Sequence, residues 1–223
     1  MARIPAEERR LQFVEAAARV IAAEGLPAAT TRRIAAEADA PLAALHYCFR
    51  NKDELLKEVY YFLSRDYAKS LPPIEDLGDG LPSVIRQHAR RIWDRMLQRP
   101  HEQVTTFELL LRRFREGPEQ EPIAREQNRS MYEGWVLSTG DLFRSAAEAS
   151  GQHIPEDLDL IARLFVSGID GISMQHLACP DETQSRRLIE LLADSLGALV
   201  SSAPSASTGD RTAGEHVSVG ARR

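Results

Sequence analysis

The sequence has few cysteines and no long apolar run, and these absences exclude several classes of protein. Two cysteines, Cys48 and Cys179, occur in 223 residues, which is too few for a disulfide framework of the kind that holds small secreted domains together. No stretch approaches the roughly 20 apolar residues that a transmembrane helix needs. The segment MARIPAEERR at the N-terminus lacks the apolar core of a signal peptide. We therefore expect a cytoplasmic protein that does not enter a membrane.

Residue patterns for catalysis and metal binding are also missing. The sequence has no phosphate-binding loop, nucleophile elbow or paired metal-ligand motif. Among His88, His101, His153, His176 and Cys179, only the last two stand at close ligand spacing, three residues apart, and one such pair does not make a metal site. We therefore predict that the protein is not an enzyme and binds no cofactor or metal.

An excess of basic residues is absent as well, although the chain holds 43% hydrophobic residues and can form a core. The net charge of −5 at first argues against a DNA-binding protein. Residues 1–60 contain nine Lys/Arg and nine Asp/Glu, so the rest of the chain carries the whole negative excess. Between residues 30 and 52 basic side chains outnumber acidic ones. The charge distribution is compatible with local phosphate contacts but does not require them.

Apolar residues recur at helical spacing along most of the chain, and no segment has the alternation and turn chemistry of a sheet. We predict an all-α fold with helices at 6–24, 52–70, 81–99, 104–115 and 122–149, a helix from Pro155 to Cys179, and a last one from Asp181 to about Val200. Two short helices lie between residues 30 and 48. This organisation predicts an N-terminal three-helix domain at 1–50 and a C-terminal helical bundle at 51–200, connected by helix 52–70, and a disordered polar tail at 201–223.

Residues 28–56, AATTRRIAAEADAPLAALHYCFRNKDELL, have the pattern of a helix-turn-helix. Thr30 has N-cap chemistry for the first short helix. Asp39 tolerates the left-handed backbone that a tight interhelical turn needs, and Pro41 suits the start of a new helix. Leu42 and Leu45 then form the buried side of the second helix, whose other faces carry small residues and hydrogen-bond donors. Two helices joined this way can place one helix in the major groove of DNA.

This stretch resembles the N-terminal domain of the tetracycline-repressor (TetR) family of transcription regulators. The resemblance runs from about Arg10 to Val59 and includes the segment Leu45-His46-Tyr47-Cys48-Phe49, followed by Asn51-Lys52. The family pattern there is leucine, two aromatic residues, a variable residue, phenylalanine, and then serine or asparagine with lysine. Three positions depart from it, because the family usually has glycine where this chain has Asp39 and Ala43, and tyrosine where it has His46.

The resemblance implies which side chains contact DNA. The positions that hold the DNA backbone in this family are occupied by Thr30, Arg32, His46, Tyr47 and Lys52, and those that face the groove by Pro41, Leu42, Ala43 and Ala44. A small apolar reading surface can contact thymine methyl groups but offers few bidentate base contacts, so specificity would depend on DNA shape and backbone register. The alternative is that Leu42 and Tyr47 are core residues, an interpretation that we prefer for Leu45 and Phe49.

The family position of Cys48 allows two interpretations. A redox switch requires a thiol of lowered pKa in a cationic setting, or a partner cysteine. No second cysteine lies nearby in the sequence. We therefore favour a small residue at a position that varies in the family.

Aromatic residues and methionines on separate helices of the C-terminal half could line a cavity for a small molecule. The candidate wall consists of Trp93, Met96, Phe107, Leu111, Phe114, Trp135, Phe165 and Met174, with Asp170 and Gln175 as polar anchors. The family resemblance implies an effector here, and we expect a small, mostly apolar molecule. The alternative for each residue is ordinary core. A basic run, Arg86, Arg90, Arg91 and Arg95, leaves an anionic ligand open, although a solvated face paired with neighbouring acidic residues is the simpler explanation.

We expect a homodimer, because one helix-turn-helix reads few bases and a two-fold dimer can read two half-sites about 34 Å apart. The segments 158–177 and 188–199 have more apolar surface than one core face requires, and two such helix pairs would form a four-helix interface. Its expected residues are Ile161, Leu164, Phe165, Ile169, Ile172, Leu191, Leu192, Leu196 and Leu199.

These features predict a transcription repressor that binds a pseudo-palindromic double-stranded DNA operator as a homodimer and is released by a small-molecule effector. The departures at Asp39, Ala43 and His46 leave open an alternative from another class. In that alternative the chain is a helical small-molecule-binding protein whose helix-turn-helix no longer reads DNA specifically.

Overall fold

The structure is a computed structural model of the chain and describes residues 5–66 and 71–202. Within these ranges the regular structure is entirely helical, which confirms the predicted all-α fold. The N-terminal elements are α1 (Ala6–Glu24), η1 (Leu26–Ala28), α2 (Thr31–Glu37), α3 (Leu42–Cys48), α4 (Lys52–Tyr61) and a π-helical turn, η2 (Phe62–Asp66). The remaining elements are η3 (Leu77–Asp79), α6 (Leu81–Gln98), α7 (Pro100–Arg112), α8 (Glu121–Ala149), α9 (Leu158–Ala178) and α10 (Glu182–Ser202).

Several helix ends lie where the sequence signals place them. Helix α1 ends at Gly25, whose φ of 81° is accessible to glycine at little cost. Asn51 caps α4, because its side-chain oxygen accepts a 2.8 Å hydrogen bond from the backbone N–H of Glu54. Helix α9 ends two residues before Pro180, which lacks the N–H that a continuing helix needs.

Three helices differ in detail from the predicted ranges. The helix expected at 52–70 changes to the π-helical turn at Phe62, and residues 67–70 lie outside the described part of the chain. Helix α7 begins at Pro100 rather than near residue 104, because a proline at the first helical position loses no hydrogen bond and has a φ suited to the helix. Helix α10 continues to Ser202, two residues into the expected tail, whose remaining residues 203–223 are not among those described.

Two clusters of buried residues form the core. The first joins α1–α4 and η2 with Leu109 of α7 and Met131 of α8. The second lies among α6, α8, α9 and α10, around Trp93, Phe143 and Phe165. Because the first cluster continues well beyond residue 50 and includes residues of α7 and α8, the helix-turn-helix packs directly on the C-terminal bundle. The domain boundary at residue 50 stays a prediction.

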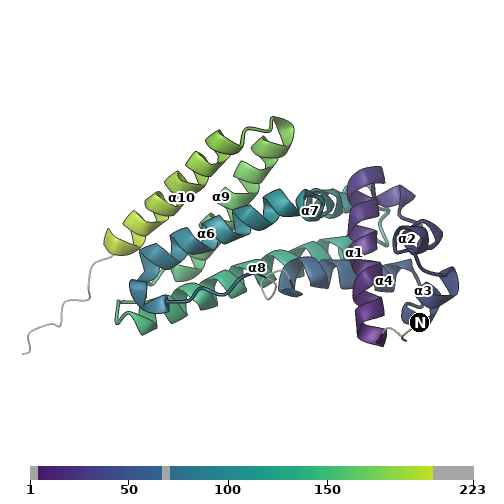
Figure 1. Cartoon of the computed structure of the whole chain (residues 1–223), viewed down its shortest axis with the longest axis horizontal. Coiled ribbons are helices and arrows are strands. Elements are labelled where there is room, and N and C mark those ends of the chain that lie inside the picture. Colours follow the sequence, from purple (N-terminus) through teal and green to yellow (C-terminus); the bar gives the residue numbers. More distant parts are fainter. Residues whose placement is uncertain (1–4, 67–70, 203–223) are drawn as a thin grey trace, which may run out of the picture.

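The molecule is elongated, with α1–α4 at one end and the antiparallel pair α9 and α10 toward the other (Figure 1). Helices α6 and α8 run along the length between these ends, and α1 stands across them (Figure 1). Within the described residues, no helix combines the length and apolar character needed to cross a membrane. This arrangement separates a candidate DNA-binding end from a candidate association surface.

Candidate nucleic-acid interface and ligand cavity

The turn between α2 and α3 has the geometry expected of a helix-turn-helix. Thr30 caps α2 by accepting a 3.2 Å hydrogen bond from the backbone N–H of Arg33. Asp39 has a φ of 47°, so it supplies the left-handed residue that the turn needs. The amide of Gln12 on α1 donates a 2.7 Å hydrogen bond to the carbonyl of Ala38. The turn is therefore fixed to α1 as well as to its own helices.

Helix α3 is held by packing on one side and by Arg10 at its end. Leu45 and Phe49 are 0% and 1% exposed, as expected for core residues, and the ring of Phe49 meets that of Phe13 edge to face at 6.5 Å. Arg10 donates to the carbonyl of Cys48 and lies 4.4 Å from the Phe49 ring centroid. A cation at the C-terminus of a helix also favours the helix dipole.

The role of Arg10 in positioning α3 was not predicted from the sequence. Its position on α1 could have indicated this role, because Arg10 lies three and four residues before the buried Phe13 and Val14. A charged residue on the buried face of a helix needs a partner there. Arg10 has that partner in Glu58, whose carboxylate accepts its hydrogen bond at 3.2 Å.

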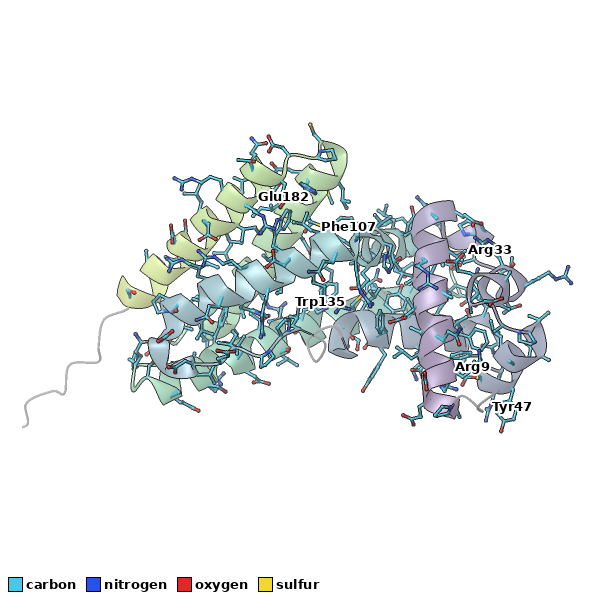
Figure 2. All side chains as sticks on the ribbon, viewed as in Figure 1. Arg9, Arg33, Tyr47, Phe107, Trp135 and Glu182 are labelled. Atoms are coloured by element: carbon cyan, nitrogen blue, oxygen red, sulfur yellow. The ribbon has the colours of Figure 1, made fainter. Side chains whose placement is uncertain are left out.

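The outer face of α3 is open to solvent. Tyr47 is 83% exposed, and Figure 2 shows it at the outer edge of this end of the molecule. The alternative that Tyr47 belongs to the core is therefore wrong. Pro41, Ala43 and His46 are also exposed, whereas Leu42 is half-buried against the first core. Ala44 is half-buried in the same way, and Thr30 and Arg32 are exposed at the start of α2.

The basic residues around the motif differ in their freedom to bind phosphate. Arg33 is paired with Glu24 at 2.7 Å and with Glu37 at 3.1 Å. Lys52, which was expected to contact the DNA backbone, donates a 3.0 Å hydrogen bond from its ammonium to the carbonyl of Leu26. Burial lowers the pKa of this ammonium. The start of α4 lies against η1, and the ammonium satisfies a carbonyl there. Two other exposed arginines, Arg32 and Arg50, form no salt bridge with any described residue.

A cavity of about 630 Å³, counted out to its solvent mouth, lies among α6, α7, α8 and α9. Its lining consists of Leu63, Leu71, His88, Ile92, Glu102, Gln103, Thr106, Trp135, Ser138, Thr139, Phe165, Val166, Ile169 and Asp170. The wall is thus polar on α7, apolar on α9 except for Asp170, and mixed on α6 and α8.

Three of the expected ligand-binding residues, Trp135, Phe165 and Asp170, line this cavity, and Figure 2 shows Trp135 inside the bundle. The other seven do not line it, and a role for them in ligand binding stays a prediction. Trp93 and Met96 are buried in the second core instead, and Phe107 is half-buried. The other four are exposed: Leu111, Phe114, Met174 and Gln175. The helical phase of α7 turns Glu102, Gln103 and Thr106 toward the cavity, so Phe107 of this helix points elsewhere.

Asp170 is the charged group that α9 brings to the cavity. Its carboxylate accepts a 2.6 Å hydrogen bond from the hydroxyl of Tyr132 and a 3.2 Å bond from the amide of Gln103. Burial raises the pKa of this carboxyl, and the two hydrogen bonds oppose the shift. The sequence identified Asp170 as a polar anchor but gave no sign of Tyr132 and Gln103, which come from two other helices.

The remaining titratable groups of the lining carry no unpaired charge. Glu102 accepts two hydrogen bonds from Arg95, at 2.8 and 2.9 Å, and lies 3.2 Å from Arg99. Burial lowers the pKa of His88 to about 3, so its imidazole is neutral at pH 7. Its Nδ1 accepts a 3.1 Å hydrogen bond from Arg91.

Two sequence families match separate parts of the chain. Residues 13–59 match the family described as bacterial regulatory proteins, tetR family. Residues 85–201, more than half of the chain, match the family described as BetI-type transcriptional repressor, C-terminal. The chain belongs to the TetR family. The resemblance found in the motif is therefore confirmed, and TetR-family proteins are transcription regulators rather than enzymes.

This TetR-family chain is also similar to individual proteins, one of them a transcriptional repressor. It is 29% identical over 192 residues to the HTH-type nicotine-responsive transcriptional repressor HdnoR of Paenarthrobacter nicotinovorans, covering 86% of this chain and 95% of the relative. The multidrug binding protein EbrR, solved with ethidium, is 25% identical with a TM-score of 0.54, over 85% of this chain and 98% of that one. FadR of Bacillus subtilis, solved with stearoyl-CoA, shares the fold at 18% identity and a TM-score of 0.55, over 87% and 99% of the two chains.

Proposed function

We propose that this TetR-family regulator is a repressor that binds a pseudo-palindromic operator as a homodimer and leaves it when a small molecule occupies the cavity. The observation that carries the proposal is the solvent-facing surface of α3, with Tyr47 83% exposed on a helix whose other side is fixed by Leu45, Phe49 and Arg10. A helix that is fixed on one side and open to solvent on the other suits insertion into the major groove. Because the protein acts on bacterial DNA, we place it in the cytoplasm.

The proposed DNA contacts follow the exposure of the side chains. Phosphate contacts come from Thr30, Arg32, His46 and Tyr47, with Arg50 taking the part that Lys52 was expected to play. The groove-facing residues are Pro41, Leu42, Ala43 and Ala44, of which the first and third are the most exposed. A surface with so few hydrogen-bond donors recognises the shape of the operator and its thymine methyl groups more than individual base edges.

The proposed dimer forms through α9 and α10. These helices expose the large apolar side chains of Leu160, Leu164, Met174, Leu191 and Leu199. Five residues expected in the interface, Ile161, Phe165, Ile169, Ile172 and Leu196, are buried in the core of a single chain instead. Exposed apolar patches mark association surfaces. The interface that we propose is therefore the outer stripe of both helices.

The proposed release mechanism passes through α7. This helix lines the cavity with Gln103 and Thr106, and between them the hydroxyl of Thr105 donates a 2.6 Å hydrogen bond to the carbonyl of Ala18 on α1. A ligand that shifts α7 therefore moves α1 and, with it, the spacing of the two motifs in a dimer. A preference of about 1–3 kcal/mol for one spacing changes DNA affinity about 5- to 150-fold. The nicotine-responsive repressor and the ethidium-binding protein among the relatives support an organic effector.

The test is a gel-shift titration with DNA taken from upstream of the chain's own gene. We expect Arg32→Ala to weaken binding to every bound sequence and to lower the slope of log affinity against log salt by about one, because one phosphate contact is lost. Arg144→Ala is the matched control and should bind as the parent does, because this exposed arginine lies beside Asp159 of α9, outside the helix-turn-helix. Binding no tighter than to random DNA at every site tried would favour the ligand-binding protein without a DNA target.

A further inference from the structure

We propose that the cavity takes an organic cation, in which a protonated amine or cationic ring pairs with Asp170 and an apolar body lies against Trp135 and Phe165. The proposal deepens the proposed function, since it gives the chemical class of the effector and rests on that cavity being the effector site.

The first step is that Asp170 lacks a cationic partner. Its hydrogen-bond donors, Tyr132 and Gln103, are both neutral. No lysine, arginine or histidine of the described residues forms a salt bridge with it. An ionised carboxylate has about four acceptor positions, and these two donors occupy two of them. The carboxylate therefore has free lone pairs for a ligand.

The second step is the cost of leaving this charge unpaired. Moving a carboxylate out of water is unfavourable unless an opposite charge or sufficient hydrogen bonds replace the water. The raised pKa of Asp170 has burial as its main cause, so two neutral donors do not replace what was lost. A cation bound beside the carboxylate would supply the missing interaction. A neutral molecule would exclude more water and leave the carboxylate without an opposite charge.

The third step is that, among the described residues, no basic side chain beside the cavity is available to an anion. The basic side chain that reaches the lining from α6 is occupied, because Arg95 is paired with Glu102. The rest of the basic run faces away from the cavity or is bound. Arg86 and Arg90 lie 2.5 Å from Asp194 and 2.6 Å from Glu190, respectively, and Arg91 donates a 2.6 Å hydrogen bond to the carbonyl of Pro72.

The fourth step is the aromatic surface beside the carboxylate. The indole N–H of Trp135 donates a 2.7 Å hydrogen bond to the carbonyl of Leu63, which fixes the ring in the cavity wall. The ring of Tyr132 meets it edge to face at 5.0 Å. Aromatic faces attract cations as well as apolar groups. A flat cationic molecule can therefore satisfy the carboxylate and the aromatic wall together.

The experiment compares three probes of nearly equal shape that differ in charge: 1-methyl-4-phenylpyridinium, the uncharged 4-methylbiphenyl, and anionic biphenyl-4-carboxylate. Binding to the full chain is measured by tryptophan fluorescence at pH 7.5, without DNA. We expect the cation to bind at least 10-fold more tightly than either of the others. In Asp170→Asn, which keeps the shape of the side chain, the cation should lose at least 10-fold in affinity and the neutral probe less than 3-fold.

Asp159→Asn is the matched control, because it removes a carboxylate from the same helix at a side chain that is 80% exposed and outside the cavity lining. It should bind all three probes as the parent does. Equal binding of the cation and the neutral probe, or an unchanged cation affinity in Asp170→Asn, would overturn the proposal. If Asp170→Asn does not fold, the ranking of the three probes on the parent chain still decides it. A chain that binds the cation without releasing DNA would contradict the proposed function and leave this inference standing.

Discussion

Buried polar side chains decide how the C-terminal bundle responds to pH, and His88 is the strongest case. The imidazole is 5% exposed and stacks on Phe165 with ring centroids 5.0 Å apart and planes 6° apart. Phe143 meets it edge to face at 6.2 Å. Because burial lowers the folded-state pKa to about 3, the unfolded chain binds a proton near pH 6.5 and the folded chain does not. Stability contributed by the neutral imidazole is therefore lost as the pH falls from about 6.5 toward 3.

We expect His88→Gln to reduce the loss of stability between pH 7 and pH 5 by about 2 kcal/mol, since a pKa difference is worth about 1.36 kcal/mol per unit. The measurement is the free energy of unfolding in urea at both pH values. His153→Gln, at an exposed histidine, should retain the parent's pH dependence. An equal loss in His88→Gln and in the parent chain would show that His88 does not titrate on unfolding.

The residue scale also shows what the sequence could predict. Thr30, Asp39, Leu45 and Phe49 were interpreted correctly because caps, turns and core positions depend on neighbours a few residues away. The contact of Lys52 with the carbonyl of Leu26 was not predicted, because it joins residues 26 positions apart. The cavity wall was largely missed for the same reason: aromatic residues are conspicuous in a sequence, whereas the phase of one packed helix against another is not.

At the scale of elements, the pairing of α9 with α10 depends on a missing side chain. Gly168 lies on α9, and a Cβ added there would lie 2.6 Å from both terminal methyl groups of Leu192. Such a contact forces one of the helices or the leucine to move. Glycine has a lower helix propensity than every other residue except proline. Close approach of the two helices is therefore the reason for glycine at this position.

We expect Gly168→Val to destabilise the chain by about 1–3 kcal/mol, the usual cost of overpacking, and Leu192→Ala to relieve part of that cost when both changes are combined. Urea unfolding of the two single variants and the double variant gives the coupling energy. Gly171→Val is the matched control on the same helix, because an added Cβ there meets nothing within 4 Å. It should show no coupling to Leu192→Ala. Strict additivity for Gly168→Val as well would contradict the packing argument.

For the molecule as a whole, the question is how one chain with an exposed apolar stripe and a single helix-turn-helix reads an operator. The DNA-binding end and the α9–α10 pair lie toward opposite ends of the elongated chain (Figure 1). Association through α9 and α10 would leave both motifs free to reach the same face of a duplex. A two-fold interface also repeats every contact, so a single substitution in it acts twice.

This symmetry gives the last prediction. Leu164 on α9 is 50% exposed, and in the proposed dimer Leu164→Arg would bury two unpaired charges. We expect the dimer dissociation constant to rise at least 100-fold and specific operator binding to be lost with it, because the half-sites no longer act together. Leu137→Arg on α8, a leucine 61% exposed outside the stripe, is the matched control and should remain dimeric and bind DNA. Light scattering across a concentration series measures both variants. A dimer that survives Leu164→Arg but dissociates in Leu137→Arg would place the interface on α8.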